Sequence, residues 1–319
     1  MISKIIATGS YLPHHKITND DLAQFMDTSD AWIHQRTGIR SRYFEDDSNT
    51  NMATQAALNT GFDLEQVDAI IVCTYTPDDL IPTVASSVKK ALGLQRPIPC
   101  FDINAACTGF LYGLEVADSL VKTGKYRHIL LIGSDFNSRV MDFTDRASAV
   151  LFGDGAGAII LTQDPHSGII DTQIHAVDDQ DESILLHGGN DFPNPYVKRD
   201  LEEDIHFRMK GADVFRFAVS VFSKSIENMM QKHNLSGEDI DFVISHQANK
   251  RIIESGARAL KMPLSKFPMN LDRVGNTSAG SIPILLDEMF KDGRLQKGMR
   301  ILLIAFGGGL SHGVSYLEV

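Results

Sequence analysis

The chain has 319 residues, a formal net charge of −11, and 43% hydrophobic and 22% charged side chains. These proportions are typical of a globular protein with a sizeable core, and they argue against disorder, collagen-like repeats and coiled coil. The acidic balance also argues against a protein that coats nucleic acid, which needs an excess of Lys and Arg. The cysteines, Cys73, Cys100 and Cys107, are too few for a disulfide framework and fit a reducing compartment.

The first residues of the chain and the length of its apolar runs bear on the cellular location of the protein. The chain opens Met1-Ile2-Ser3-Lys4-Ile5-Ile6, followed by Gly9 and Pro13, which predicts a short strand and a turn. A signal peptide would have a basic start and a longer apolar stretch. No run is continuously apolar over the roughly 18–20 residues that span a bilayer. We therefore expect a soluble, cytoplasmic protein that binds neither membrane nor nucleic acid.

Short runs rich in β-branched residues alternate with segments of helical spacing. In chain order, the patterns predict strands at 67–74, 99–103, 129–133, 158–162, 169–177, 240–244 and 301–305, and helices at 84–92 and 109–122. Strands that alternate with helices in this way predict an α/β fold, with a mostly parallel sheet covered by helices.

The second half of the chain repeats the order of the first. Four pairs of segments match at nearly the same separation: Val67-Asp68 with Ile240-Asp241, Cys107-Thr108-Gly109 with Ser278-Ala279-Gly280, 122–125 with 291–294, and 129–132 with 301–304. One match would be chance, but four in order predict two copies of one α/β unit, at 1–165 and 166–319. A duplicated unit tends to form clefts between its copies, at the ends of the strands.

Residues 178–206 interrupt this repeat. They contain acidic stretches at 178–182 and 202–204, on either side of turns that contain Gly and Pro. This composition favours a solvated surface excursion over a functional lid.

Cys107 is the first candidate for chemistry. It lies in Asn104-Ala105-Ala106-Cys107-Thr108-Gly109-Phe110, where a strand ends, small residues follow and a helix begins. The start of a helix favours thiolate over thiol, and small neighbours let an acyl group come close. The alternative is a buried, inert cysteine, which is the usual fate of a free thiol. Cys73 and Cys100 lie in predicted strands and are expected to belong to the core.

Three further motifs follow predicted strands or turns. They are Ser245-His246-Gln247-Ala248-Asn249, Gly275-Asn276-Thr277-Ser278-Ala279-Gly280 and Phe306-Gly307-Gly308-Gly309. A lone His is more often structural, the second motif also fits a turn with a helix N-cap, and the third also fits a plain flexible turn. The glycine N–H groups could instead stabilise a thioester oxyanion. The glycine-rich 152–157 does not lead into a helix, which argues against a dinucleotide or phosphate loop.

Taken together, these motifs resemble beta-ketoacyl-[acyl-carrier-protein] synthase III, the initiating condensing enzyme of bacterial type II fatty acid synthesis. The resemblance runs nearly end to end and includes the segments 27–33, 36–40 and 152–157. It implies the thiolase fold, a duplicated five-layer α-β-α-β-α arrangement, and a homodimer. It also implies a decarboxylative Claisen condensation between an acyl-CoA primer and malonyl-acyl carrier protein.

The resemblance assigns catalytic roles to matching positions. Cys107 matches the nucleophile that takes the acyl group. His246 and Asn276 match the donors that hold the enolate oxygen after carbon dioxide leaves. The backbone N–H groups of Cys107 and Gly308 match a second oxyanion hole, for the acyl carbonyl, and Phe306 matches a residue packed beside the thiol.

The resemblance also assigns binding roles. The positions that match CoA contacts are Trp32, Arg36, Arg146 and Asn249. The positions that match or suit carrier-protein docking are Arg216, Arg251 and Arg258. Ile81 matches a position that shapes the acyl pocket. The family implies no metal and no cofactor, because CoA thioester and malonyl-acyl carrier protein are both substrates.

Other interpretations of the same motifs stay open. Cys, His and Asn in that order also occur in papain-like hydrolases, which have a different local Cys signature and no long duplication. A degradative thiolase would carry a second reactive Cys before the C-terminal glycines, where this chain has Ala305-Phe306. A non-catalytic homologue would be expected to lose Cys107 or His246. A specialised-metabolite condensing enzyme of the same superfamily would have nearly identical motifs.

Overall fold

The computed structural model describes residues 2–188 and 206–319. In this part of the chain the strands form one main sheet. Its order is β11 (Phe242–Ser245), β12 (Arg300–Gly307), β13 (Ser311–Glu318), β8 (Ile169–Ala176), β1 (Ile2–Tyr11), β7 (Gly155–Asp164), β6 (His128–Asp135), β4 (Ala69–Cys73) and β5 (Cys100–Ile103). β1 and β8 pair only at Ser3 and Ile169, so the sheet consists of two half-sheets that meet at one point.

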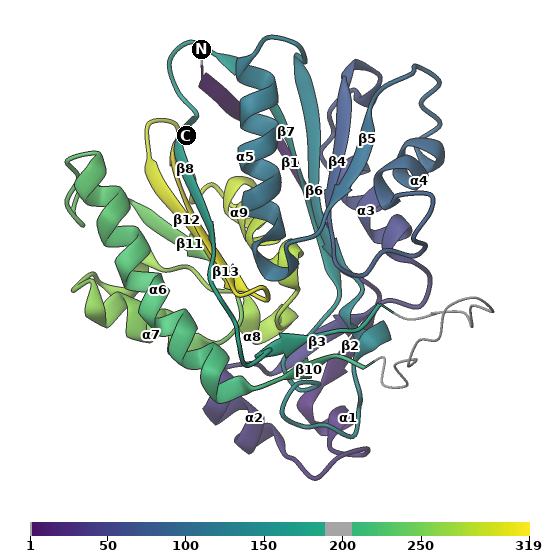
Figure 1. Cartoon of the computed structure of the whole chain (residues 1–319), viewed down its shortest axis with the longest axis vertical. Helices are drawn as coiled ribbons and strands as arrows, with labels where there is room; N and C mark the ends of the chain where they lie inside the picture. Colours follow the sequence, from purple (N-terminus) through teal and green to yellow (C-terminus); the bar gives the residue numbers. More distant parts are fainter. Residues whose placement is uncertain (1, 189–205) are drawn as a thin grey trace.

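Helices cover and separate the two half-sheets (Figure 1). α3 (Asn49–Leu58) and α4 (Val84–Ala91) cover the outer face of the first half-sheet, and α6 (Gly211–Lys232) covers the outer face of the second, with α7 (Lys250–Ala259) beside it. α5 (Gly109–Lys122) and α9 (Ser281–Lys291) lie between the half-sheets. The result is the five-layer α-β-α-β-α arrangement that the sequence predicted.

The expectation of a mostly parallel sheet was wrong. β4 runs parallel to β5 and β6, and β11 runs parallel to β12, because helices connect these strands. The other pairs of the main sheet are antiparallel, and among them a short turn joins β12 to β13. The predicted strands and both predicted helices otherwise overlap observed elements, and several predicted ranges extend one or two residues beyond them. The glycine-rich 152–157 leads into β7 and not into a helix, as expected.

The two copies correspond one place away from the alignment that the sequence suggested. The short 3₁₀ helices η2 (Ala106–Thr108) and η5 (Ser278–Gly280) precede α5 and α9, and each begins with a residue of positive φ, 46° at Ala106 and 51° at Ser278. Cys107 therefore corresponds to Ala279 and not to Ser278. α5 has 14 residues and α9 has 11. The sequence separation between matching positions of the two copies is therefore smaller at the ends of these helices than at their starts.

Smaller elements surround one end of the main sheet. They are β2 (His15–Thr18), β3 (Ser41–Phe44), α1 (Asn19–Leu22), α2 (Asp30–Thr37), α8 (Leu271–Val274), β9 (Ile184–Leu185) and β10 (Arg208–Met209), with 3₁₀ helices η1 (Leu64–Gln66), η3 (Asn137–Val140) and η4 (Leu264–Lys266) elsewhere. β2 pairs with β3 and β9 pairs with β10. The small strands and short helices at this end of the sheet, together with η2 and η5, surround the candidate motifs.

Candidate active site

Cys107 lies where the first copy passes from strand to helix. β5 ends at Ile103, Ala106 adopts its left-handed conformation, and η2 leads into α5. The Asn104 side chain steadies this turn, because its Oδ1 accepts a hydrogen bond of 3.3 Å from the Ala106 N–H. The thiol therefore lies just ahead of a 14-residue helix, whose N-terminal N–H groups favour an anion.

The second copy makes room for this cysteine. The end of β12 packs against η2, and a Cβ atom on Gly307 would lie 2.6 Å from the Cβ of Cys107. Any larger residue at position 307 would have to displace the nucleophile. Gly307, the last residue of β12, therefore leaves the space that Cys107 occupies.

Burial governs the reactivity of the Cys107 thiol. Desolvation raises its pKa to about 12, a hydrogen bond from the Ser278 side chain lowers it, and the charge of Asp135 raises it. Cys107 is therefore a thiol at neutral pH, although thiolate is the form that attacks a thioester.

The other two cysteines have no place in this site. Cys73 is fully buried inside β4, which confirms its predicted place in the core. Cys100 is only partly buried, so the expectation of a core position was wrong. The reason is that β5 is an edge strand of the main sheet.

His246 directly follows β11. Its backbone N–H donates a hydrogen bond of 2.7 Å to the Ile304 carbonyl, and its ring meets the Phe306 ring edge-on, with 5.4 Å between centroids. Desolvation lowers the pKa of His246 to about 3, so the imidazole is neutral at physiological pH. A neutral imidazole still carries one N–H donor. His246 can therefore donate a hydrogen bond to an oxygen in the pocket without adding a positive charge.

Asn276 is held by the segment that precedes β7. Its N–H donates to the Leu151 carbonyl at 2.9 Å, and its own carbonyl accepts from the Gly153 N–H at 3.0 Å. The side-chain Oδ1 accepts a hydrogen bond of 2.9 Å from the Ser278 N–H. Because Oδ1 is engaged in this way, the amide N–H₂ of Asn276 is the group left to serve a ligand. A Cβ at Gly153 would lie 2.5 Å from a backbone oxygen, so the 152–157 motif supports Asn276 by close packing.

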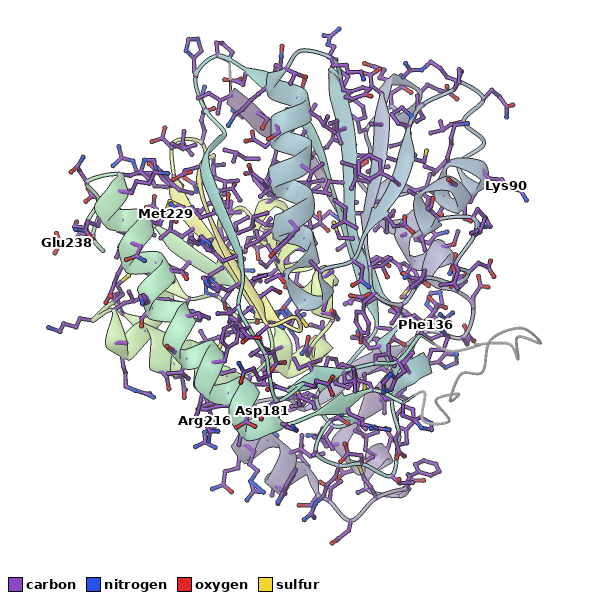
Figure 2. The ribbon with its side chains drawn as sticks, viewed as in Figure 1. Lys90, Phe136, Asp181, Arg216, Met229 and Glu238 are labelled. Atoms are coloured by element: carbon purple, nitrogen blue, oxygen red, sulfur yellow. The ribbon has the colours of Figure 1, made fainter. Side chains whose placement is uncertain are left out.

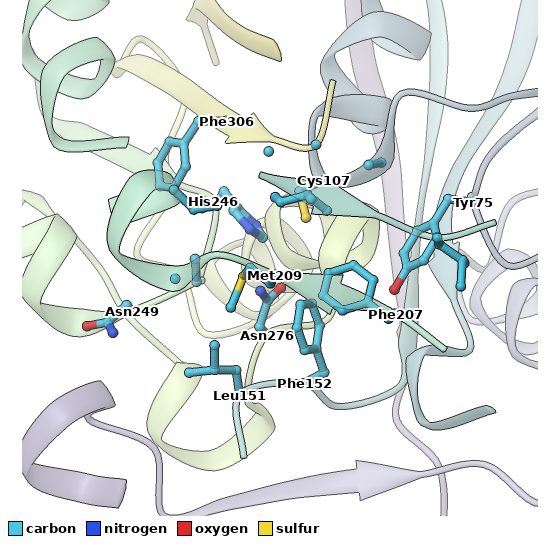
Figure 3. A pocket seen from close by; sticks show the side chains of 18 of the residues that line it. Tyr75, Cys107, Leu151, Phe152, Phe207, Met209, His246, Asn249, Asn276 and Phe306 are labelled. Atoms are coloured by element: carbon cyan, nitrogen blue, oxygen red, sulfur yellow. The ribbon is translucent and has the colours of Figure 1, made fainter. Parts of the chain in front are cut away.

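The structure brings Cys107, His246 and Asn276 to one cavity of about 1000 Å³ (Figure 3). The thiol, the imidazole and the amide come from both copies and face the same space. Phe306 and Gly308 also line this cavity, close to Cys107. The cavity is built from both copies. η2 belongs to the first copy and η5 to the second, and the two are in contact.

Trp32, Arg36 and Arg146 line the same cavity. The guanidinium of Arg36 lies 4.3 Å from the centre of the Trp32 ring, and that of Arg146 lies 5.1 Å from it. Arg146 also donates a hydrogen bond of 2.6 Å to the carbonyl of Asp27. Two cations thus converge on one indole, which is a suitable place for an anionic ligand with a flat ring.

Asn249 lines the cavity while it caps α7. Its Oδ1 accepts from the Arg251 N–H at 2.9 Å, and its Nδ2 donates to the Arg36 carbonyl at 3.2 Å. This side chain therefore joins the start of α7 to α2.

The expectation of a solvated surface excursion at 178–206 was right for the acidic stretch 178–182, which is mostly exposed, and wrong for the residues that follow it. Ile184 and Leu186 line the cavity, as do Phe207 and Met209 just beyond the excursion, and β9 pairs with β10 there. The acidic stretch 202–204 lies outside the described residues. The signal in the sequence was the apolar run Ile184-Leu185-Leu186 directly after the acidic residues.

Tyr75 is a cavity residue that sequence reasoning missed. It follows β4, and its hydroxyl donates a hydrogen bond of 2.6 Å to Oδ1 of Asn137. Burial raises the pKa of Tyr75 well above its usual value, so the phenol is neutral. The sequence could have indicated this residue by its position. Tyr75 follows a predicted strand of the first copy, just as the motif that carries His246 follows the matching strand of the second.

The three arginines assigned to docking take different places. Arg251 lines the cavity, and its guanidinium lies 5.9 Å from the centre of the Phe215 ring. Arg258 donates to the Ser255 hydroxyl at 2.9 Å and lies outside the cavity lining. Arg216 lies on the outer surface of α6 and pairs with Asp213 (Figure 2).

Ile81 does not reach the cavity of this chain. It is 90% exposed, and its neighbour Leu80 is 85% exposed although it lines the cavity. Two adjacent apolar side chains of such exposure are unusual beside a pocket.

Within residues 2–188 and 206–319, no group of three or more His, Cys, Asp or Glu side chains could hold a metal ion. In the same part of the chain, every helix is too short or too polar to cross a membrane.

Comparison with known proteins decides the family. A model of 3-oxoacyl-[acyl-carrier-protein (ACP)] synthase III matches residues 101–177, and a model of the C-terminal part of that enzyme matches residues 230–319. A beta-ketoacyl-[acyl-carrier-protein] synthase III of Clostridium beijerinckii is 42% identical to this chain, over 99% of the chain and 98% of that protein. The chain belongs to the beta-ketoacyl-[acyl-carrier-protein] synthase III family. The resemblance predicted from the sequence motifs is thereby confirmed, and the chain is an acyltransferase.

Further synthase III relatives support the same assignment. One from Pasteurella multocida is 43% identical, over 98% of each chain. A crystal structure of 3-oxoacyl-[acyl-carrier-protein] synthase III from Aquifex aeolicus VF5 superposes with a TM-score of 0.91 at 39% identity, over 99% of this chain and 100% of that one. The thiolase-like fold predicted from the sequence is confirmed by this likeness.

Proposed function

We propose that this synthase III condenses an acyl-CoA primer with malonyl-acyl carrier protein to give 3-oxoacyl-acyl carrier protein, CoA and carbon dioxide. The primer is acetyl-CoA or another short acyl-CoA, and the reaction initiates fatty acid synthesis. One observation carries the proposal: a single cavity joins a thiol at the start of a buried helix to a neutral imidazole and a free amide.

In the first half-reaction, Cys107 attacks the primer thioester. Its sulfur forms a bond to the acyl carbon, the bond from that carbon to the CoA sulfur breaks, and CoA leaves. The N–H groups of Cys107 and Gly308 are the donors that we assign to the acyl oxygen. Such donors stabilise the charge that develops on that oxygen in the transition state.

In the second half-reaction, malonyl-acyl carrier protein enters the space that CoA has left. Loss of carbon dioxide leaves an enolate, whose carbon attacks the acyl group on Cys107. The bond from the acyl carbon to the sulfur breaks, and the sulfur leaves as a thiolate that takes up a proton to restore the thiol. His246 and Asn276 are the donors that we assign to the enolate oxygen. The low pKa of His246 suits this role, because a neutral imidazole donates a hydrogen bond and keeps its proton.

Three residues that line the cavity are suited to the CoA nucleotide. We assign Trp32, Arg36 and Arg146 to it, because two guanidinium groups can pair with phosphates while an indole stacks on adenine. We also assign Asn249 to CoA, because it lines the same cavity and its Nδ2 donates to the backbone carbonyl of Arg36. No cofactor is needed, because both thioesters are substrates.

The carrier protein would dock on α7 and α6. Acyl carrier proteins of this pathway are acidic and the chain itself carries −11, so contact needs a local cationic surface. Arg251, Arg258 and Arg216 are the residues that we assign to this surface, and α7 begins four residues after His246.

We further propose a cytoplasmic homodimer. β5 is an edge strand of the main sheet, and a second copy could pair along it. Leu80 and Ile81 follow β4, the neighbour of β5, and a partner there would cover their exposed side chains. Ile81 would then shape the acyl pocket of the partner subunit.

The test is an assay with purified chain, malonyl-acyl carrier protein and a series of acyl-CoA primers. We expect 3-oxoacyl-acyl carrier protein to form only when both substrates are present, with one CoA released per product. Product from malonyl-CoA that equals the product from malonyl-acyl carrier protein would contradict the assigned substrate. Sedimentation of the same preparation tests the dimer.

A further inference from the structure

Ser278 contacts the nucleophile from the opposite copy. Its Oγ donates a hydrogen bond of 3.5 Å to the Sγ of Cys107. Ser278 is 1% exposed, and its left-handed backbone conformation, with φ of 51°, orients the side chain. The family motif accounts for Asn276 in this turn and leaves the hydroxyl of Ser278 without a role.

A carboxylate lies behind Ser278. Asp135 is the last residue of β6 and is fully buried, and its Oδ2 accepts from the Ala279 N–H at 3.1 Å. Its Oδ1 accepts from the hydroxyls of Thr74 and Thr76, at 2.9 and 3.1 Å, and from a backbone N–H. The Ser278 side chain is also a hydrogen-bond partner of Asp135.

This arrangement joins Cys107 to Asp135 through one hydroxyl. The Ser278 hydroxyl has one proton, which it donates to the sulfur in the structure. When the hydroxyl rotates and donates to Asp135 instead, its oxygen can accept the thiol proton. The titratable groups that face Asp135 are Cys73, Tyr75 and Cys107, and the charge of Asp135 raises the pKa of each. All three are neutral at neutral pH, so Asp135 is the anion of this cluster.

Charge considerations favour transfer of the thiol proton within this chain of groups. If the thiol of Cys107 lost its proton to solvent, two buried anions would lie close together and repel each other. His246 is a poor acceptor, because burial lowers its pKa to about 3. Burial raises the pKa of Asp135 to about 6, which makes it a better base than an ordinary carboxylate while it stays ionised at neutral pH.

We propose that Ser278 and Asp135 form a proton relay that takes up the thiol proton of Cys107 during primer transfer. The Cys107 S–H proton moves to Oγ of Ser278 as the Ser278 proton moves to Asp135. The sulfur then bonds to the acyl carbon and the bond to the CoA sulfur breaks. The proton then passes from Asp135 back to Oγ of Ser278, and a proton passes from this hydroxyl to the departing CoA sulfur. CoA leaves as a thiol, and the site holds one negative charge throughout.

The inference rests on the proposed function, and one experiment separates the two. Single-turnover transfer of radiolabelled acetyl groups from acetyl-CoA to the enzyme is measured by rapid quench between pH 5 and pH 9. Ser278→Ala should slow transfer about 100-fold, the lower end of what general acid–base catalysis contributes. The control is Ser281→Ala, which removes an equally buried hydroxyl, 1% exposed, that bonds Thr277 instead of the thiol.

The pH profile distinguishes a relay from a packing role. In the wild type, the rate should fall as pH drops through about 6, because the accepting carboxylate of Asp135 becomes protonated. Ser278→Ala and Asp135→Asn should both lose this acid limb, and their slower rates should rise steadily with pH. If Asp135→Asn fails to fold, Ser278→Ala carries the test alone.

The outcomes are distinct. Wild-type rate and profile in Ser278→Ala would overturn the relay while leaving the proposed function intact. Equal slowing in Ser281→Ala would also overturn it, because the effect would then come from lost packing. Absence of acetyl transfer to Cys107 in the wild type would overturn the proposed function itself.

Discussion

The two junctions that lead into the central helices, 104–108 before α5 and 276–280 before α9, share a backbone conformation and differ in chemistry. In each, an Asn side chain accepts a hydrogen bond from the N–H two residues later, at 3.3 Å for Asn104 and 2.9 Å for Asn276. In each, a residue of positive φ and a three-residue 3₁₀ helix then lead into a central helix. The first junction has Cys107 where the second has Ala279, so only the first supplies a nucleophile. Duplication provided the geometry twice, and the side chains then diverged.

The strands behind the junctions differ in the same sense. The end of β6 packs against the second junction and ends in Asp135, whereas the end of β12 packs against the first and ends in Gly307. Glycine leaves space for the thiol, and the carboxylate binds the Ala279 N–H. Each copy therefore completes the junction of the other, which explains why the site needs both.

The largest expected effect comes from removing the nucleophile. Cys107→Ala should abolish labelling by radiolabelled acetyl-CoA, whereas Cys73→Ala should keep it, because Cys73 is enclosed in β4. Adding Ala279→Cys to Cys107→Ala places a thiol at the matching position of the second junction. We expect no labelling there, since Ala279 does not line the cavity. Peptide mapping that finds label at position 279 would show the junctions to be interchangeable.

The next effect concerns the donors of the second copy. His246→Ala and Asn276→Ala should each slow decarboxylation of malonyl-acyl carrier protein about 100- to 1000-fold, the usual cost of losing one oxyanion donor. Acetyl transfer to Cys107 should suffer less, because other donors are assigned to that step. The two half-reactions are measured separately, with His312→Ala as the control, because His312 lies outside the cavity lining. Equal losses in both steps would argue against this division.

Substitution of a glycine tests the space left for Cys107. Gly307→Ala should slow acetyl transfer about 100-fold, because its Cβ would meet the Cys107 Cβ at 2.6 Å and displace the thiol. Gly308→Ala should be milder, since its Cβ would first meet the flexible Ile184 side chain at 3.3 Å. Thermal unfolding of both variants serves as the control for folding. If Gly308→Ala proves the more damaging, the close approach at position 307 is not what positions the thiol.

The smallest effect concerns the outer helices. Arg251→Glu on α7 should raise the KM for malonyl-acyl carrier protein about fivefold, the worth of an exposed charge pair, and leave acetyl transfer nearly unchanged. Lys90→Glu makes the same charge change on α4, the counterpart of α7 in the first copy, far from the cavity (Figure 2). It should have no effect on KM, and added salt should reduce the difference between the two variants. Equal KM values at low salt would move the docking surface away from α7.

Much of this comparison was accessible from sequence. Buried strands such as β4 and β6 were predicted because they are continuous apolar runs. The order of matching segments in the two halves predicted the duplication, and the small residues around Cys107 indicated it as the candidate nucleophile. The shift of one residue between the junctions was not accessible, because it depends on backbone conformation at Ala106 and Ser278. The antiparallel pairs were missed because the alternation of strands and helices does not show which distant strands lie side by side, as β1 and β7 do. The contact of Ser278 with Cys107 was missed because it exists only when the copies pack together.

The most direct test of the account is a chase through Cys107. Enzyme loaded with radiolabelled acetyl-CoA is freed of CoA and then mixed with malonyl-acyl carrier protein. The account predicts that label on the Cys107 peptide disappears at the rate at which labelled 3-oxoacyl-acyl carrier protein appears. Label that stays on Cys107 while unlabelled primer supports turnover would contradict the account, because Cys107 would then lie off the reaction path.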